Sequence, residues 1–383
     1  MSTAAQHAIA ADHVFDGAVV HRDAAVVIDG ARIVAIAPRA AVPAAVPVRA
    51  LPEGTWLAPG FIDVQVNGGG DVLFNDAPTV EGIRAIAAAH RKYGTTALLP
   101  TLITDAPEKM RAAIAAVQGV VDTDPGIVGI HLEGPFLSPE RPGVHDPRYI
   151  RVPTAEDGAM LAARRRGVTV VTLAPEQAPP GFVRLLASAG VRVCLGHSMA
   201  TYAQTRAALA EGLTGFTHLF NAMRPLGNRE PGPIAAALES PGAWFGMIVD
   251  GAHVDPAMLR LALRGAAKPM LVTDAMPPVG GSRPAFALYG EHIAVRDGVC
   301  VRDDGVLAGS ALNMAAAVGN CVRLLDVPLH DALRFASTHP ASFLGLEHML
   351  GRLAPGYRAD LVALDPIGFA VLDTWVAGRA ATA

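Results

Sequence analysis

The sequence predicts an α/β protein, in which a (β/α)8 TIM-type barrel carries a small β-sandwich domain formed by the N- and C-terminal segments. Two observations lead to this prediction. Short apolar runs alternate eight times with alanine-rich stretches of helical periodicity, a pattern typical of parallel strands covered by helices. Both ends of the chain instead contain short β-favouring runs joined by turn residues. The 383 residues suffice for a large barrel and a modest appendage.

The two terminal segments are predicted to form one unit. The N-terminal segment has β-favouring runs at 24–28 and 31–36 around Asp29-Gly30, a hairpin turn signal. The C-terminal segment has similar runs at 359–364 and 375–376, separated by a break at Asp365-Pro366. Neither end can bury a core alone, so we expect them to pair. The expected domains are 1–56 plus 355–383 for the β-sandwich, and 57–354 for the catalytic barrel.

The central segment supplies the barrel strands in order. Strands are predicted at 61–66, 97–99, 127–132, 168–173, 191–195, 215–217, 245–249 and 270–273. The clearest helices between them are predicted at 80–93, 106–117, 201–210 and 256–264. In such a barrel, the active site is built from the C-terminal ends of the strands and the loops that follow.

Composition excludes several classes of protein. The net charge of −4 and the lack of a dense Lys/Arg cluster argue against nucleic-acid binding. Cys194, Cys300 and Cys321 show no CxxC spacing, which argues against a disulfide framework and favours a reducing compartment. We see no signal peptide and no run of ~20 apolar residues, so we expect a cytoplasmic protein without a membrane span.

Polar residues occupy the ends of four predicted strands. His131 and Glu133 end the third strand, His197 follows the fifth, His218 ends the sixth and Asp274 ends the eighth. Single histidines at strand ends usually bond a backbone carbonyl, but this joint placement favours a common site. Glu133, His197 and His218 can converge on one divalent cation and leave positions open for water. Zn2+ suits this donor set, and Fe2+ is compatible with it.

This constellation indicates hydrolysis of an amide. A divalent cation lowers the pKa of water toward ~7 and so makes hydroxide available at neutral pH. Asp274 can take the proton of the water and pass it to the leaving nitrogen. The substrate carbonyl also needs a polarising partner as charge develops on its oxygen, and the cation and a histidine could both serve.

Eight short stretches of the sequence carry a family resemblance. They are 59–68 (PGFIDVQVNG), 131–136 (HLEGPF), 196–198 (GHS), 217–223 (THLFNAM), 229–232 (REPG), 250–254 (DGAHV), 272–275 (VTDA) and 354–356 (APG). Together they resemble the N-acetylglucosamine-6-phosphate deacetylases of the amidohydrolase superfamily, over nearly the whole chain. The resemblance implies hydrolysis of the acetamide of N-acetyl-D-glucosamine 6-phosphate to D-glucosamine 6-phosphate and acetate, in amino-sugar catabolism or recycling.

The resemblance also implies substrate-binding residues. His145 matches a histidine that contacts the substrate and helps to polarise the acetyl carbonyl. Arg229 and His253 match a pair that binds the phosphate, for which a planar, permanently charged arginine is well suited. The family arginine comes from the neighbouring subunit, so a homodimer is implied. The remaining implied contacts are Val144, Asn221, Ala222, Asp250, Gly251, Ala252, Leu307, Ala308 and Gly309, the last three in a loop that closes over the sugar.

One motif departs from the pattern of many amidohydrolases. Those enzymes carry His-x-His at the end of the first strand and bind two metals, whereas this chain has Gln65 and Asn67 there. Neutral amides are poor zinc ligands compared with imidazole, so we predict one catalytic metal per chain. Part of the resembled family shares the Gln-x-Asn pattern. The adjacent run Gly68-Gly69-Gly70 is interpreted as a flexible loop rather than a phosphate cradle, and 279–289 as a candidate lid segment.

Three other functions are compared with the sequence. The same chemistry on N-acetylgalactosamine 6-phosphate is the nearest, since loop details set the preference at C4. A cyclic amidase such as dihydroorotase is disfavoured, because the fourth strand ends Leu173-Ala174-Pro175-Glu176 without the lysine that bridges two metals. A non-catalytic sugar-phosphate-binding protein would have no need for Asp274 beside a metal site.

Overall fold

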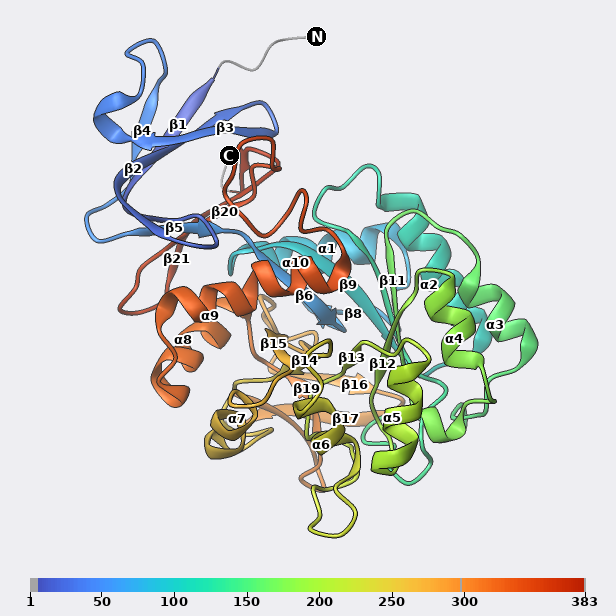
Figure 1. Ribbon diagram of the computed structural model, residues 1–383. Coiled ribbons are helices and arrows are strands. Elements are labelled where there is room, and N and C mark those ends of the chain that lie inside the picture. The colour runs from blue at the N-terminus through green and yellow to red at the C-terminus, as the bar shows by residue number, and fades with distance from the viewer. Residues whose placement is uncertain (1–5, 297, 382–383) are drawn as a thin grey trace.

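The centre of the molecule is a barrel of eight parallel strands. This computed structural model describes residues 6–296 and 298–381. The strands neighbour one another in chain order (Figure 1), and Asp274 N bonds Gln65 O at 3.0 Å where the last strand meets the first. Their bounds are β6 Phe61–Val66, β9 Thr95–Ile103, β10 Gly129–Glu133, β11 Val168–Leu173, β12 Arg192–Leu195, β13 Gly215–Phe216, β14 Trp244–Met247 and β15 Lys268–Leu271. All eight predicted strands are confirmed.

Helices cover the outside of the barrel. Helix α1 buries Ile83, Ile86, Ala87 and His90, positions that share one helical face and pack on the strands. The helices begin at polar caps where the sequence supplies them, as at Thr79, whose side chain accepts from Gly82 N. Their bounds are α1 Val80–Arg91, α2 Pro107–Val120, α3 Ala155–Ala162, η2 Pro175–Gln177, α4 Phe182–Ser188, α5 Tyr202–Ala210, α6 Gly232–Leu238 and α7 Pro256–Ala262.

The two chain ends form one mixed sheet beside the barrel. Strand β5 pairs with β1 of the N-terminal segment on one side and with β20 of the C-terminal segment on the other, so the predicted pairing is confirmed. The sheet bends (Figure 1). It buries a core that includes Ile9, Val26, Leu361 and Trp375. The bounds are β1 His7–Phe15, β2 Val20–Asp29, β3 Arg32–Pro38, η1 Arg39–Ala41, β4 Val48–Ala50, β5 Trp56–Pro59, β20 Leu361–Leu364, β21 Val371–Val376 and β22 Arg379–Ala380.

A segment after the eighth strand forms elements that the sequence did not predict. A four-stranded antiparallel sheet spans the candidate lid region and the loop expected to close over the sugar. Ser310 N donates to Asp274 O at 2.9 Å, which ties this sheet to the end of the barrel. The bounds are β16 Ala285–Leu288, β17 Glu291–Arg296, β18 Val299–Arg302 and β19 Leu307–Ser310, followed by α8 Met314–Leu325, α9 Leu329–Ala336 and α10 Thr338–Leu344.

The glycine run after the first barrel strand is packed, so its interpretation as a flexible loop was wrong. Strands β7 (Gly68–Gly69) and β8 (Val72–Leu73) form a small hairpin. Gly68 N donates to Ala275 O at 2.8 Å, and a ring nitrogen of His90 lies 2.9 Å from Gly68 O. A Cβ on Gly68 would lie 2.5 Å from Val72 O, so glycine is needed for close backbone approach.

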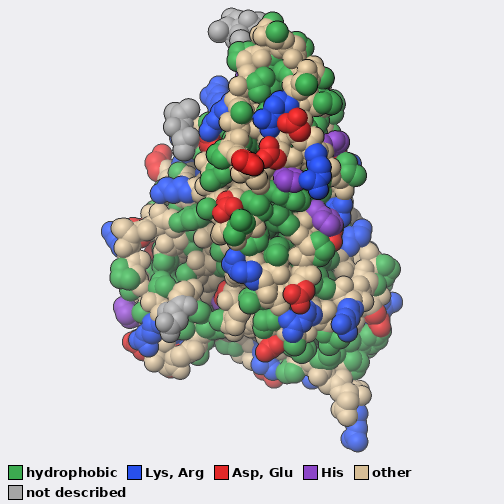
Figure 2. All heavy atoms as spheres, turned by 90° about the vertical axis from the view of Figure 1, so that its left-hand side faces the viewer, with side chains coloured by type: hydrophobic (Ala, Val, Ile, Leu, Met, Phe, Trp, Pro, Cys, Tyr) green, Lys and Arg blue, Asp and Glu red, His purple; other side chains and the backbone are tan. Residues whose placement is uncertain are grey.

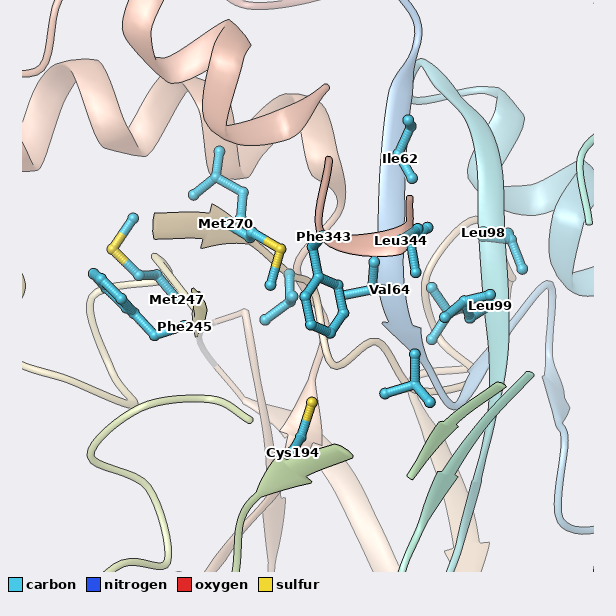
Figure 3. Close-up of a cluster of buried hydrophobic side chains, with 14 of the residues drawn as sticks. Ile62, Val64, Leu98, Leu99, Cys194, Phe245, Met247, Met270, Phe343 and Leu344 are labelled. Atoms are coloured by element: carbon cyan, nitrogen blue, oxygen red, sulfur yellow. The ribbon is translucent and has the colours of Figure 1, made fainter. Parts of the chain in front are cut away.

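Apolar side chains fill the barrel interior on the side of helix α10. Phe343 reaches from the end of α10 into the space between Val64 of β6, Met270 of β15 and Cys194 of β12 (Figure 3). These residues belong to the main hydrophobic core of the protein. Because this side is packed with apolar groups, the polar chemistry of the barrel is concentrated at the opposite, C-terminal ends of the strands.

The surface carries charges of both signs. Figure 2 shows Lys and Arg side chains interspersed with Asp and Glu and with apolar patches, over the terminal sheet and the barrel alike. This face has no continuous basic area, in agreement with the net charge of −4. Within 6–296 and 298–381, none of the helices has the length and apolar character needed to cross a bilayer.

Candidate active site

Three predicted ligands from three strands come together. Glu133 is the last residue of β10, and His197 and His218 each lie two residues beyond the end of β12 and β13. All three are buried, and one donor atom from each lies within 4.8 Å of the others. Glu133 Oε1 lies 3.1 Å from His197 Nε2 and 2.9 Å from His218 Nε2, and the two nitrogens are 3.2 Å apart.

The donor set fits a divalent cation. His197 Nδ1 lies 2.8 Å from Arg141 O, and since a carbonyl only accepts, Nδ1 carries the ring proton. His197 Nε2 therefore presents a lone pair to the centre of the cluster, which is the form in which imidazole binds a metal. Two imidazole lone pairs and one carboxylate charge directed at one buried point fit a divalent cation, which would take up the lone pairs and offset the charge.

The backbone at these residues is held in an unusual conformation. His197, His218 and Asp274 all have positive φ, at 49°, 32° and 52°. Such left-handed conformations are uncommon in residues other than glycine and concentrate at functional sites. At the first of these turns, the Glu176 carboxylate accepts from Ser198 Oγ at 2.7 Å and from Met199 N at 2.6 Å, which holds the chain directly after His197.

Gln65 and Asn67 contact the carboxylates of the site through their amide N–H groups. Gln65 Nε2 donates to Glu133 Oε2 and to Asp274 Oδ1, both at 3.1 Å. Asn67 Nδ2 donates to Asp274 Oδ1 at 2.6 Å. The two amides thus act as hydrogen-bond donors at the positions where many amidohydrolases carry metal-binding histidines. This arrangement supports the prediction of a single metal.

The two carboxylates of the site differ in their acidity. Burial and the nearby charge of Glu133 raise the pKa of Asp274 to about 6. Burial also raises the pKa of Glu133, but the close contact with His218 and the positive charge of that ring outweigh it and hold that pKa well below its usual range. Neighbouring acids whose pKa values are driven apart can take separate roles. Glu133 suits a permanently ionised ligand, and Asp274 suits proton transfer near neutral pH.

The Asp63 carboxyl in β6 makes stability depend on pH. It is fully buried, accepts from Thr273 Oγ1 at 2.5 Å, and burial raises its pKa to about 7. A raised pKa means that the Asp63 carboxyl binds its proton more tightly in the folded state than in the unfolded state. The protonated carboxyl therefore stabilises the fold fully below the unfolded pKa of about 4, and this stabilisation is lost as pH rises through about 7.

Replacing Asp63 with asparagine is therefore expected to change the free energy of unfolding more favourably at high pH than at low pH. Between about pH 5 and about pH 8, the unfolding free energy of the wild type should fall relative to that of Asp63→Asn by on the order of 2 kcal/mol. Denaturant unfolding at both pH values measures this change. A difference between the two proteins that is the same at both pH values would contradict a protonated Asp63.

A cavity of about 190 Å³ opens over the cluster and is lined by Glu133, His197, His218 and Asp274. Of the substrate-binding residues predicted from the resemblance, those lining it are Val144, His145, Asn221, Ala222, His253, Leu307 and Gly309. Those outside the lining of this chain's cavity are Arg229, Asp250, Gly251, Ala252 and Ala308. The sequence alone did not indicate five further lining residues, because apolar residues and glycine give no chemical signal. They are Ile103, Gly143, Ile248, Met276 and Val306.

Three of the residues outside the lining have identifiable places. Asp250 lies behind His253, with its Oδ2 2.6 Å from His253 Nδ1. Ala308 is buried under the rim. Arg229 is exposed on the loop between β13 and α6, which extends below α6 in Figure 1. Within one chain, Arg229 therefore does not reach its own cavity.

The model of the amidohydrolase family matches residues 56–381. That range covers the whole barrel and the C-terminal strands. The chain belongs to the amidohydrolase family. The candidate metal ligands and the candidate acid–base residue of the chain lie at or just after the ends of barrel strands, within the matched range.

Relatives within the amidohydrolase family share most of the chain. It is 43% identical to N-acetylgalactosamine-6-phosphate deacetylase of Shewanella sp. (strain ANA-3), over 86% of this chain and 84% of that one. It is 34% identical to N-acetylglucosamine-6-phosphate deacetylase of Haemophilus influenzae, over 94% of each. These relatives place it in the N-acetylhexosamine-6-phosphate deacetylase branch, which confirms that it is an enzyme.

Solved structures agree with this placement. N-acetylglucosamine-6-phosphate deacetylase from Pasteurella multocida superposes with a TM-score of 0.94 at 36% identity, over 98% of this chain and 99% of that one. A mutant of the Mycobacterium smegmatis deacetylase, in complex with N-acetyl-D-glucosamine-6-phosphate, superposes with a TM-score of 0.89 at 36% identity, over the same shares. The predicted fold class is thus confirmed.

Proposed function

We propose that this amidohydrolase hydrolyses the acetamide of N-acetyl-D-glucosamine 6-phosphate to D-glucosamine 6-phosphate and acetate. The observation that carries the proposal is the convergence of a buried metal-binding cluster, Asp274 and His145 on one cavity. The Mycobacterium smegmatis relative, whose structure holds this sugar phosphate, supports the choice of substrate.

The residues of the cavity divide the reaction between them. When bound by Glu133, His197 and His218, a divalent cation supplies Lewis acidity and makes water acidic enough to react at neutral pH. Asp274 takes a proton from the attacking water and delivers it to the leaving nitrogen. Gln65 and Asn67 both donate to Oδ1 of Asp274, so we assign the proton transfer to Oδ2.

The sugar phosphate is held by residues further from the reacting bond. His253 faces the cavity and is oriented by Asp250. Arg229 binds the phosphate of the neighbouring active site in a homodimer, a proposal supported by its exposure on a loop outside its own cavity. Leu307, Ala308 and Gly309, expected in a closing loop, instead lie in strand β19; Leu307 and Gly309 line the cavity and are placed to contact the sugar, and Ala308 is buried between them.

N-acetyl-D-galactosamine 6-phosphate is the second candidate substrate. The 43% identity to the Shewanella enzyme of that name favours it. An acetate-release assay with both epimers, each with and without the 6-phosphate, tests both candidates. We expect phosphorylated substrates to exceed unphosphorylated ones in kcat/KM by about 100-fold, as charged phosphate contacts of about 3 kcal/mol would give. Absence of acetate release from both sugar phosphates would contradict the proposed function.

The metal content is expected to be one tightly bound divalent cation per chain, with Zn2+ proposed and Fe2+ as the alternative. The donor set offers three ligands, and the amides of Gln65 and Asn67 already donate to carboxylates. Chelation should remove activity, and one equivalent of Zn2+ should restore it. Elemental analysis of protein purified without chelator measures the content. Two tightly bound equivalents would contradict the single-metal site.

A further inference from the structure

Thr104 follows directly after β9 and lies against His145, across 41 residues of sequence. Its backbone N–H donates to His145 Nδ1 at 3.2 Å, and its Oγ1 lies 2.8 Å from the same nitrogen. Thr104 is buried and does not line the cavity. We propose that Thr104 is a positioning residue that fixes the tautomer of His145, so that Nε2–H faces the substrate.

The tautomer follows from the direction of one hydrogen bond. A backbone N–H can only donate, so His145 Nδ1 must accept and carries no proton. The Thr104 hydroxyl is then a second donor to the same lone pair. It is closer to Nδ1 than to its alternative acceptor Glu133 O, at 3.4 Å. In the neutral ring the proton must be on Nε2.

The proton on Nε2 decides what His145 can do. Nε2 lies 3.9 Å from Glu133 Oε1, the oxygen on which the nitrogens of His197 and His218 converge. A protonated nitrogen has no lone pair for a metal, so His145 is beside the ligand set without being a fourth ligand. Its N–H is free to donate to the carbonyl oxygen of an acetamide bound in the cavity, where negative charge develops.

The neighbouring histidine has the opposite tautomer. The rings of His145 and His197 are 4.3 Å apart, yet His197 Nδ1 donates to Arg141 O and leaves its Nε2 unprotonated. A backbone carbonyl behind one ring and a backbone N–H behind the other thus create one metal ligand and one hydrogen-bond donor. The roles of the two histidines are set by groups outside the cavity.

Thr104 is itself held in place on both sides. Asn75 Oδ1 accepts from Ile103 N at 3.1 Å and Asn75 Nδ2 donates to Ile103 O at 3.0 Å, fixing the residue before Thr104. The Tyr289 hydroxyl, at the turn between β16 and β17, donates to Thr104 O. The antiparallel sheet that forms the cavity rim therefore also supports the residue behind His145.

The test compares Thr104→Val with Thr104→Ser, and rests on the proposed deacetylase function. Valine keeps the shape and the backbone N–H but removes the hydroxyl, whereas serine keeps the hydroxyl. We expect Thr104→Val to lower kcat about 10-fold on the N-acetyl sugar phosphate, because His145 loses one of the two hydrogen-bond donors that hold its ring. Thr104→Ser should stay within about 3-fold of the wild type, with one metal equivalent retained in both.

A substrate with a more reactive carbonyl separates positioning from a general structural effect. The N-trifluoroacetyl analogue needs less help from a hydrogen-bond donor, so the defect of Thr104→Val should shrink to about 3-fold or less. An equal defect on both substrates, an unimpaired Thr104→Val, or a Thr104→Ser as impaired as valine would overturn the proposal.

A measurement without turnover tests the tautomer directly. In the zinc-loaded wild type labelled with 15N-histidine, long-range 1H–15N correlation spectra should show His145 protonated at Nε2 and His197 at Nδ1, with His145→Gln providing the assignment. Protonation of His145 at Nδ1 would overturn the inference. A wild type that shows the expected tautomers but releases no acetate would overturn the proposed function and leave the assignment of Thr104 to the tautomer standing.

Discussion

Replacement of Asp274 by asparagine should lower kcat by about 10³-fold, since general acid–base groups contribute about 10² to 10⁴ to rate. Asparagine cannot take up a proton, so neither the attack of water nor the departure of the amine is assisted. Its Oδ1 can still accept from Gln65 and Asn67, which donate to that oxygen in the wild type. The fold and the binding of about one metal equivalent should therefore survive.

The measurement is acetate release at saturating substrate, with metal content and unfolding temperature recorded for the same preparations. Asp303→Asn is a matched control, because it makes the same chemical change at an exposed carboxylate outside the cavity. It should leave kcat unchanged. If Asp274→Asn keeps more than about a tenth of wild-type turnover, Asp274 is not the proton-transfer residue.

The barrel could be predicted because its strands are buried on both faces. Strand β9 buries all of its residues and β10 likewise, so they form apolar runs that a sequence reveals. The antiparallel sheet after β15 could not be recognised in this way, because its strands are short and half-exposed. Strand β17 buries only Ile293. Turn glycines at Gly290, Gly298 and Gly305 are the signal that could have located it.

The candidate metal ligands could also be predicted, since parallel strand ends meet at one edge of a barrel. The contacts behind the ligands could not. Gln65 bridges Glu133 and Asp274 across 68 and 209 residues of sequence, and Thr104 reaches His145 across 41. No sequence motif relates residues that are so far apart along the chain, so these contacts can be recognised only once the strands are placed side by side. The glycine run at Gly68 was misjudged for the same reason, because its partners lie near Ala275.

Replacement of Arg229 by alanine should lower kcat/KM selectively for phosphorylated substrates. The expected loss in kcat/KM is about 100-fold for the sugar 6-phosphate, from the loss of a charge-assisted contact, with little change for the unphosphorylated acetyl sugar. Arg229→Lys is the matched comparison, and should recover part of the loss, because lysine keeps the charge without the planar fork. Equal loss on both substrates would contradict a role in phosphate binding.

Mixing two impaired proteins, assayed on the sugar phosphate well below KM, tests whether Arg229 acts in the neighbouring subunit. In a heterodimer of Arg229→Ala and Asp274→Asn chains, the chain that keeps Asp274 receives Arg229 from its partner, so one of the two sites is complete. Random exchange of equal amounts makes about half of the dimers heterodimers, so about a quarter of wild-type activity should return. Native mass spectrometry would verify the exchange. If Arg229 served its own subunit, each site of the mixture would carry one defect, and no activity beyond the sum of the parents would appear.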